Sequence, residues 1–357
     1  TSPFYTYSLD NPSFEVGGDI AFGINVFDQA DGSNNKNGPY SIELFAGDKL
    51  IFSITSYKYS YSETRYVNSL IDYSYFINNK ERFIRTEIDE FNKLSVYDVK
   101  DGIVAVNQGD TLKMKYVVKD YNNNVSILPF TLIGVESPEI EQNNILPNLS
   151  YNIFDGKSSD INLNGFEAHI PKNAFYRDVT LGVSKIDTIE NIFSDYAYRF
   201  GSNDVPLHKK IKIRIKVAEE YVDDTLLYVA SVDKNGKLSY LGNKYNDDFI
   251  EAQTNVLGTY LIARDEIKPA IKPLNFKSGA TITENWSLRL EIEDKESGIN
   301  KYEMLVNGEW VLAEYDAKNN LLIYQIDNHI KKGHNTLEVI VTDMLGNKCV
   351  YSTNLQR

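Results

Sequence analysis

Cysteine, methionine and histidine are scarce in this sequence. Among 357 residues the chain has one cysteine, three methionines and four histidines. A single cysteine, Cys349, excludes an intrachain disulfide framework and a structural zinc site built from cysteines. Because Val350 and Tyr351 follow it, we expect Cys349 to be a small packed side chain on a strand.

Long apolar runs and positive charge are also scarce. No stretch approaches the roughly 20 apolar residues that a membrane-spanning helix needs, and no signal-peptide pattern follows Thr1. Lys and Arg number 37 against 50 Asp and Glu, a net charge of -13. A nucleic-acid backbone or an anionic membrane surface would repel such a chain. We therefore expect no nucleic-acid partner, no membrane span and a chain that is soluble as given.

The motifs of common catalytic and cofactor sites are missing as well. The histidines are His169, His208, His329 and His334, and none forms His-x-x-x-Asp, His-x-His or His-Glu-x-x-His. The sequence has no phosphate-binding loop, Gly-x-Ser-x-Gly elbow or dinucleotide fingerprint. It therefore predicts no catalytic residue, no cofactor-binding residue and no metal ligand in this chain. Whether the parent protein is an enzyme stays open.

Acidic residues gather in turns, at residues 28–34 and 294–297. Asp, Asn and Gly are typical of tight turns, and this explains both clusters. Calcium ligation by their oxygens is the alternative. A chelator that leaves the melting temperature unchanged would exclude it.

Aromatic residues, by contrast, are abundant, with 25 Tyr and 17 Phe. They favour β-strands, because aromatic side chains suit a pleated, half-buried surface. A chain of 357 residues also exceeds what one compact core accommodates. We predict an all-β protein of three consecutive β-sandwich modules, of which the first and third are immunoglobulin-like.

The boundaries of the modules follow turn and proline signals. Residues 1–136 form the first module, with a Tyr-rich insertion at about 55–106 that has no counterpart near the C-terminus. Residues 137–148 are polar and contain two prolines, as expected of a linker. The middle β-sandwich spans 149–264 and the C-terminal module spans 265–357.

Two stretches occur twice, in the same order. An extended run ends at Asp120 in the first module and at Asp343 in the third, and an Asn-Asn or Gly-Asn pair follows each. Residues 38–48 likewise parallel residues 298–308. This pattern is that of a strand entering a tight hairpin. The repeat predicts equivalent strands in both terminal modules, with the two aspartates capping equivalent turns.

The clearest period-two pattern runs from Ile211 to Val217, where isoleucines alternate with basic residues. It predicts a strand with one core face and one basic face. We expect the basic row to pair with acidic residues on adjacent strands rather than to form an anion site.

The insertion carries our candidate binding residues, Tyr57, Tyr59 and Tyr61, which alternate as if on one face of a strand. Exposed tyrosines stack on sugar rings or anchor a protein partner. The alternative is that these rings cover the core of their own module. Residues 66–76 have apolar spacing that supports a short helix or a turn.

Several short segments stand out over nearly the whole chain. They are Glu63-Thr64-Arg65-Tyr66, Ile71-Asp72-Tyr73, Pro206-Leu207-His208-Lys209, Leu257-Gly258-Thr259-Tyr260, Lys268-Pro269, Pro273-Leu274-Asn275-Phe276, Glu293-Asp294-Lys295-Glu296-Ser297-Gly298-Ile299 and Val341-Thr342-Asp343. Together these segments resemble the C-terminal β-domains of lysostaphin-type (LytM-like) zinc metallopeptidases of Gram-negative bacteria.

The resemblance implies a non-catalytic accessory or scaffold region in the periplasm or at the outer cell surface. It would position a peptidase domain or dock to a cell-envelope protein. Zinc is expected only in a separate peptidase domain, because the ligand pattern of the family is absent here. The alternative function is a module that binds peptidoglycan, another glycan or a protein partner.

Overall fold

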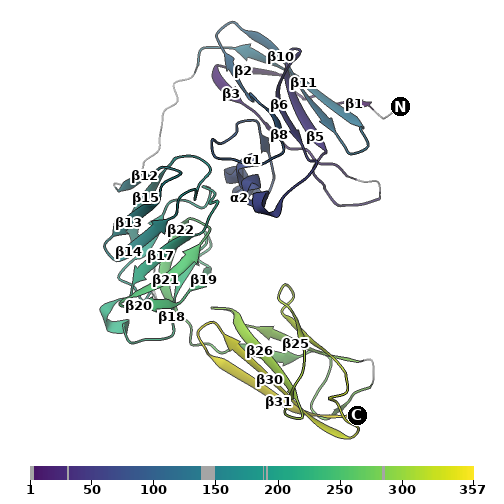
Figure 1. Cartoon of the computed structure of the whole chain (residues 1–357), viewed down its shortest axis with the longest axis vertical. Helices are drawn as coiled ribbons and strands as arrows, with labels where there is room; N and C mark the ends of the chain where they lie inside the picture. The colour runs from purple at the N-terminus through teal and green to yellow at the C-terminus, as the bar shows by residue number, and fades with distance from the viewer. Residues whose placement is uncertain (1–3, 30–31, 138–148, 188, 190–191, 284–285) are drawn as a thin grey trace.

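The protein is all-β, and its β-sandwich modules follow one another along the chain (Figure 1). The structure is a computed structural model that describes residues 4–29, 32–137, 149–187, 189, 192–283 and 286–357. The predicted linker 137–148 lies outside the described residues from position 138 onward. Among the described residues, no helix has the length and apolarity to cross a bilayer.

The first module is an immunoglobulin-like sandwich with short helices in its insertion. Its strands are β1 (Phe4–Thr6), β2 (Ser13–Val16), β3 (Gly18–Ala21), β4 (Gly23–Ile24), β5 (Ser41–Ala46), β6 (Lys49–Thr55), β7 (Ile84–Arg85), β8 (Tyr97–Lys100), β9 (Ile103–Val106), β10 (Thr111–Lys119) and β11 (Val125–Gly134). Its helices are η1 (Tyr61–Tyr66), α1 (Val67–Leu70) and α2 (Tyr73–Asn79). The predicted short helix is thus confirmed.

One large sheet of the first module runs β1-β11-β10-β5-β6-β8, with β2 also paired to β11. The two-stranded sheets β3-β9 and β4-β7 complete the module. The segment 55–106 begins at the end of β6 and returns through β8 and β9, so both of its ends lie in sheets of the first module. Ile42, Leu44 and Phe52 are fully buried in the core between them. The helices lie on the side of this module that faces the middle module (Figure 1).

The middle module is a sandwich of two antiparallel sheets. Its elements are β12 (Ser150–Ile153), β13 (Ser159–Leu163), β14 (Phe166–Ile170), β15 (Val179–Ile186), β16 (Ala197–Phe200), β17 (Ile211–Lys216), η2 (Glu219–Tyr221), β18 (Leu227–Val232), β19 (Leu238–Gly242), β20 (Lys244–Asn246), β21 (Phe249–Thr254) and β22 (Gly258–Arg264). One sheet runs β12-β15-β16-β22-β18-β19 and the other runs β13-β14-β17-β21-β20.

Strand β17 confirms the period-two prediction. Ile211, Ile213 and Ile215 are fully buried, because alternate side chains of a strand point to the same face. The basic residues between them form ion pairs with Glu167 and Glu251 on neighbouring strands and with Asp248. The basic row is therefore neutralised within the module, as expected.

The third module is again immunoglobulin-like. Its strands are β23 (Ala270–Pro273), β24 (Ala280–Thr281), β25 (Ser287–Glu293), β26 (Ile299–Val306), β27 (Glu309–Trp310), β28 (Glu314–Asp316), β29 (Leu321–Gln325), β30 (His334–Asp343) and β31 (Lys348–Gln356). The sheets run β23-β25-β29-β28 and β24-β31-β30-β26-β27. Asn307 (φ 53°) and Gly308 (φ 80°) form the tight turn between β26 and β27.

The repeated stretches form equivalent strands. In the first module β5 pairs with β10 and β10 with β11, and in the third β26 pairs with β30 and β30 with β31. Asp120 accepts hydrogen bonds from Asn124, and Asp343 accepts the same pair of bonds from Asn347. The last strand of each of these two modules also has parallel neighbours: β1 and β2 lie beside β11, and β24 lies beside β31.

The strand predicted for Tyr57, Tyr59 and Tyr61 is absent. β6 ends at Thr55, the next residues are irregular, and Tyr61 begins the helix η1. Thr55 pairs with Ser41, the first residue of β5, and no strand partner continues beyond it. A strand needs a hydrogen-bonded neighbour, so alternation alone does not extend β6.

Candidate functional site

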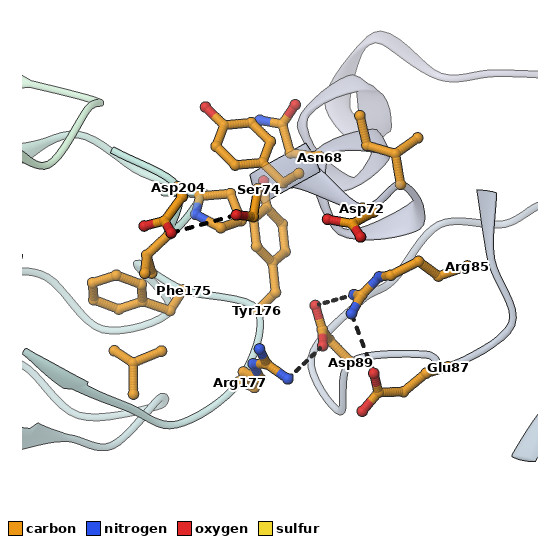
Figure 2. A pocket seen from close by; sticks show the side chains of 15 residues that line it. Asn68, Asp72, Ser74, Arg85, Glu87, Asp89, Phe175, Tyr176, Arg177 and Asp204 are labelled. Atoms are coloured by element: carbon orange, nitrogen blue, oxygen red, sulfur yellow. Dashed lines mark hydrogen bonds and ion pairs between the residues drawn. The ribbon is translucent and has the colours of Figure 1, made fainter. Parts of the chain in front are cut away.

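A cavity lies where the insertion of the first module meets the middle module. Its volume is about 350 Å³. Figure 2 shows charged and aromatic side chains of both modules around it. Its lining includes Asp72, Tyr73, Arg85, Asp89, Tyr176 and Arg177.

A break between two helices places Asp72 at this cavity. α1 ends at Leu70, and Ile71 is extended (φ -100°, ψ 161°). Asp72 then caps α2, because its Oδ1 accepts a hydrogen bond from the amide of Tyr75 at 2.9 Å. α2 ends at Asn79, and Lys80 after it adopts the left-handed conformation (φ 64°). The same carboxylate therefore starts the helix and lines the cavity.

Asp89 links the two modules electrostatically. This residue is 8% exposed, accepts a hydrogen bond from the hydroxyl of Ser69 at 2.6 Å and pairs with Arg85 at 3.1 Å. Its other oxygen, Oδ1, lies 3.7 Å from Nη1 of Arg177 in the middle module. Arg85 also pairs with Glu87 at 3.2 Å. Figure 2 shows Asp89 between the two guanidinium groups.

Aromatic rings make the second contact between these modules. Tyr66 stacks on His208 with ring centroids 4.3 Å apart and meets Tyr176 edge-on at 5.9 Å. The hydroxyl of Tyr176 donates a hydrogen bond to the carbonyl of Arg65. The amide of Phe91 donates to the carbonyl of Tyr176 at 2.9 Å. We call these contacts, together with those of Asp89, the brace.

Burial changes the proton affinities of groups in the brace and of Tyr73, which lines the cavity beside it. It raises the pKa of the Tyr176 and Tyr73 hydroxyls, which keeps both rings neutral. It lowers the pKa of His208, and the charges of Lys209 and Arg65 lower it further. The Nδ1 atom of His208 is buried and has no hydrogen-bond partner among the described residues.

The lining of the cavity is negative on balance. Carboxylates, including those of Asp72 and Asp89, outnumber the guanidinium groups of Arg85 and Arg177. On charge alone, this lining favours a neutral or cationic polar group over an anion.

The tyrosines singled out from the sequence lie on the surface, outside this cavity. Tyr57 is 80% exposed, Tyr59 is 54% exposed and Tyr61 is 102% exposed relative to the reference residue. The hydroxyl of Tyr59 donates a hydrogen bond to the hydroxyl of Ser56 at 2.8 Å. The structure brings the three together in one short exposed segment, and their partner-binding role stays a prediction.

Away from this cavity, three side chains of the described residues form a group that could hold a metal ion. Asp265, Asp294 and Asp343 offer oxygens that all lie within 4.8 Å of one another. His169 instead pairs with Asp160 at 2.6 Å. The sequence predicts turns at Asp294 and at Asp343, but it gives no sign that these turns meet Asp265.

Sequence reasoning also missed the brace. Residues 65 and 208 come from different modules, and no local periodicity connects them. The available signal was indirect. Residues 63–66 and 206–209 both carry the family resemblance, and they contact each other in the structure.

Comparison with known families places a match in the middle module. Residues 153–265 match the Zu5-like domain family. This match covers less than half of the chain. No curated protein matches the sequence.

Solved structures match this chain at low similarity. The Clostridium thermocellum CbhA fibronectin(III)-like modules are 12% identical, with 97% of this chain and 88% of that chain covered and a TM-score of 0.22. The Bacteroides ovatus mixed-linkage glucan utilization locus protein SGBP-B is 8% identical, with 96% and 64% covered and a TM-score of 0.17. The Thermotoga petrophila endo-β-1,4-mannanase is 14% identical, with 26% and 20% covered and a TM-score of 0.23.

Proposed function

We propose that this chain is a non-catalytic scaffold in which the brace holds the first module in a fixed orientation on the middle module. The carrying observation is the combination of the Tyr66–His208 stack with the Asp89–Arg177 ion pair. An aromatic stack restricts the distance between the modules, and a buried carboxylate between two guanidinium groups restricts rotation. Fixed modules present an attached domain or a partner in one orientation.

The scaffold would belong to a lysostaphin-like peptidoglycan metallopeptidase in the periplasm or at the outer cell surface. Supporting this proposal, two segments that carry the resemblance, residues 63–66 and 206–209, form part of the brace. Its partners would be its own peptidase domain or a cell-envelope protein. The sequence encoded ahead of Thr1 tests this origin: His-x-x-x-Asp and His-x-His motifs there support it, and a coding sequence without them argues against it.

Spin labels on exposed strands of the first and middle modules test the brace in the full chain. We expect a narrow distance distribution in the wild type and a broad one in Tyr66→Ala. Tyr121→Ala is the matched control, because Tyr121 is 81% exposed in the same module. A wild-type distribution as broad as that of Tyr66→Ala would refute the fixed orientation.

A second candidate function is docking of a glycan through Tyr57, Tyr59 and Tyr61. The exposure of three tyrosines within one short segment favours it, because clustered exposed rings mark binding surfaces. Isothermal titration with peptidoglycan fragments and envelope glycans should give heat for the wild type. Tyr57→Ala with Tyr61→Ala should abolish that heat, whereas Tyr121→Ala should not. The absence of heat with every glycan leaves a protein partner as the alternative to test by cross-linking.

A further inference from the structure

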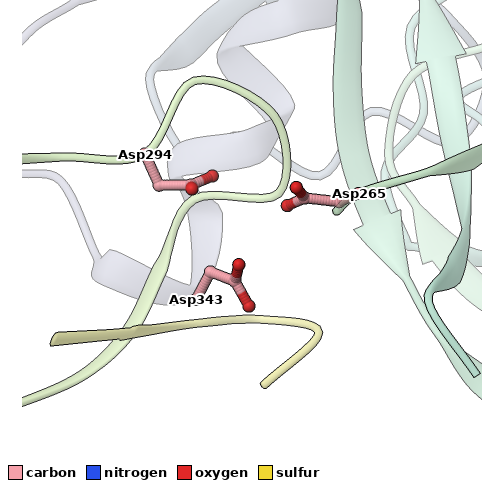
Figure 3. A group of neighbouring side chains, drawn as sticks. All are labelled: Asp265, Asp294 and Asp343. Atoms are coloured by element: carbon pink, nitrogen blue, oxygen red, sulfur yellow. The ribbon is translucent and has the colours of Figure 1, made fainter. Parts of the chain in front are cut away.

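Three carboxylates converge at the second junction, between the middle and C-terminal modules. Asp265 directly follows β22 of the middle module, whereas Asp294 follows β25 and Asp343 ends β30 of the third module. Figure 3 shows the three side chains pointing toward a common centre. Their ligand oxygens all lie within 4.8 Å of one another.

This cluster has no positive partner among the described residues. Asp265 and Asp343 are both 0% exposed, and no Lys or Arg of the described chain lies within ion-pair distance of the three carboxylates. The nearest arginine in sequence, Arg264, pairs with Asp224 and Glu266 instead. Carboxylates withdrawn from water repel one another unless a positive charge compensates them.

Two buried oxygens at the cluster lack any partner. Oδ2 of Asp294 is shielded from solvent and accepts no hydrogen bond from the described residues. The hydroxyl of Ser297 is equally unpaired, and this residue is only 5% exposed. Its amide donates to Oδ2 of Asp265 at 3.1 Å, so Ser297 touches the cluster. Turn capping, which occupies Oδ1 of Asp294 through the amides of Glu296 and Gly298, does not account for these atoms.

The donor set selects the kind of ion. Calcium binds carboxylate and hydroxyl-type oxygens at about 2.3–2.6 Å, so two ligand oxygens on opposite sides of it lie about 4.6–5.2 Å apart. Oxygens that all lie within 4.8 Å of one another are close enough to contact one such ion. Magnesium usually keeps several waters and binds through one or two carboxylates, and zinc prefers nitrogen and sulfur ligands, which the cluster does not offer.

We propose that Asp265, Asp294 and Asp343 bind a calcium ion that locks the third module onto the middle module. Direct contacts already join these modules: Asn347 donates to the carbonyl of Asp265 at 2.9 Å, and Asn243 donates to that of Met344 at 3.3 Å. The ion adds ligands from both sides of the junction. This site is separate from the brace, so the scaffold proposal and the calcium proposal stand or fall independently.

Calcium titration of chelator-treated full-length protein tests the site. We expect saturable binding with one ion per chain, weaker binding of magnesium, and a melting temperature that rises with calcium and falls with chelator. Asp294→Asn should weaken calcium binding at least tenfold, because it removes charge while an amide oxygen still accepts the bonds of the turn. No binding by the wild type, or unchanged binding by Asp294→Asn, would overturn the proposal.

A matched pair of variants separates ion binding from turn capping. Asp343→Asn should lose calcium binding, whereas Asp120→Asn alters the equivalent turn of the first module and should retain it. If Asp343→Asn does not fold, terbium luminescence of the wild type provides the second measurement. Tyr228 belongs to a buried cluster against which Leu345, two residues after Asp343, packs, so this ring is the expected sensitiser of terbium. Terbium emission that calcium fails to displace would refute the site.

Discussion

At the scale of single residues, immediate neighbours compensate some of the buried charges of this protein. Asp89 is the clearest case, because Ser69 and Arg85 bind it within the first module and Arg177 approaches from the next. A buried carboxylate that loses its charge leaves its cationic neighbours uncompensated. The brace therefore depends on a few identifiable atoms.

The first prediction concerns Asp89→Asn. We expect the free energy of unfolding to fall by about 3 kcal/mol, because the variant breaks a buried ion pair while Arg85 stays in place. Urea denaturation of the full chain measures this change. Glu87→Gln is the control: its side chain is 42% exposed, so the loss should stay below about 1 kcal/mol. Equal losses in both variants would contradict the role of Asp89.

The second prediction is a pH dependence that originates at His208. Burial first, and then Lys209 and Arg65, lower its pKa in the folded chain. Between that lowered pKa and the ordinary value of about 6.5, the unfolded chain binds a proton that the folded chain does not. The contribution of His208 to stability is therefore complete above this window and is lost as the pH falls through it. Asp155 opposes the shift and Lys93 adds to it.

Comparison with His208→Phe isolates this effect, because phenylalanine keeps a ring on Tyr66 but does not titrate. As the pH falls from about 7.5 to about 5, the unfolding free energy of the wild type should decrease relative to that of the variant. Denaturation at several pH values measures it. A difference that stays constant over this range would contradict the prediction.

At the scale of elements, the sequence predicted what local pattern encodes. The alternation around Ile213 identified β17, and the run that ends at Asp343 identified the turn after β30. The segment from Tyr57 to Tyr61 shows the limit of such patterns. Its tyrosines alternate, but β6 ends at Thr55, opposite the first residue of its neighbour β5. The brace and the Asp265 cluster escaped prediction because their members meet only through the packing of separate modules.

The third prediction concerns the turn between β8 and β9, which anchors the insertion. The hydroxyl of Thr86 donates to the carbonyl of Gly102 at 2.6 Å, and a β-carbon at Gly102 would clash with the carbonyl oxygen of Thr86. Gly102→Ala should therefore cost about 2 kcal/mol of unfolding free energy. Thermal denaturation measures it, with Gly38→Ala as control because a β-carbon there meets nothing within 4 Å. A neutral Gly102→Ala would show that the turn relaxes freely.

At the scale of the whole molecule, net charge decides which surfaces the chain avoids. The net charge of -13 opposes the approach of anions, and the basic row on β17 is paired within the middle module. The two junctions between modules differ. Aromatic and ionic contacts lie between the first and middle modules, and converging carboxylates lie between the middle and third modules.

The fourth prediction is that the chain does not bind polyanions. Electrophoretic shift assays with duplex DNA and sedimentation with anionic phospholipid vesicles should both show no association at about 0.15 M salt, because like charges repel. A salt-sensitive, saturable association with either would contradict this expectation and would require a basic surface.

The parallel pairing of β1 and β2 with β11 has a mechanical consequence. Strands at the beginning and the end of the first module lie side by side and run in the same direction. Tension applied across the module would slide these strands lengthwise past each other, so the hydrogen bonds of each ladder would share the load instead of opening one by one. A module built in this way resists stretching, a useful property in any chain that tethers one body to another.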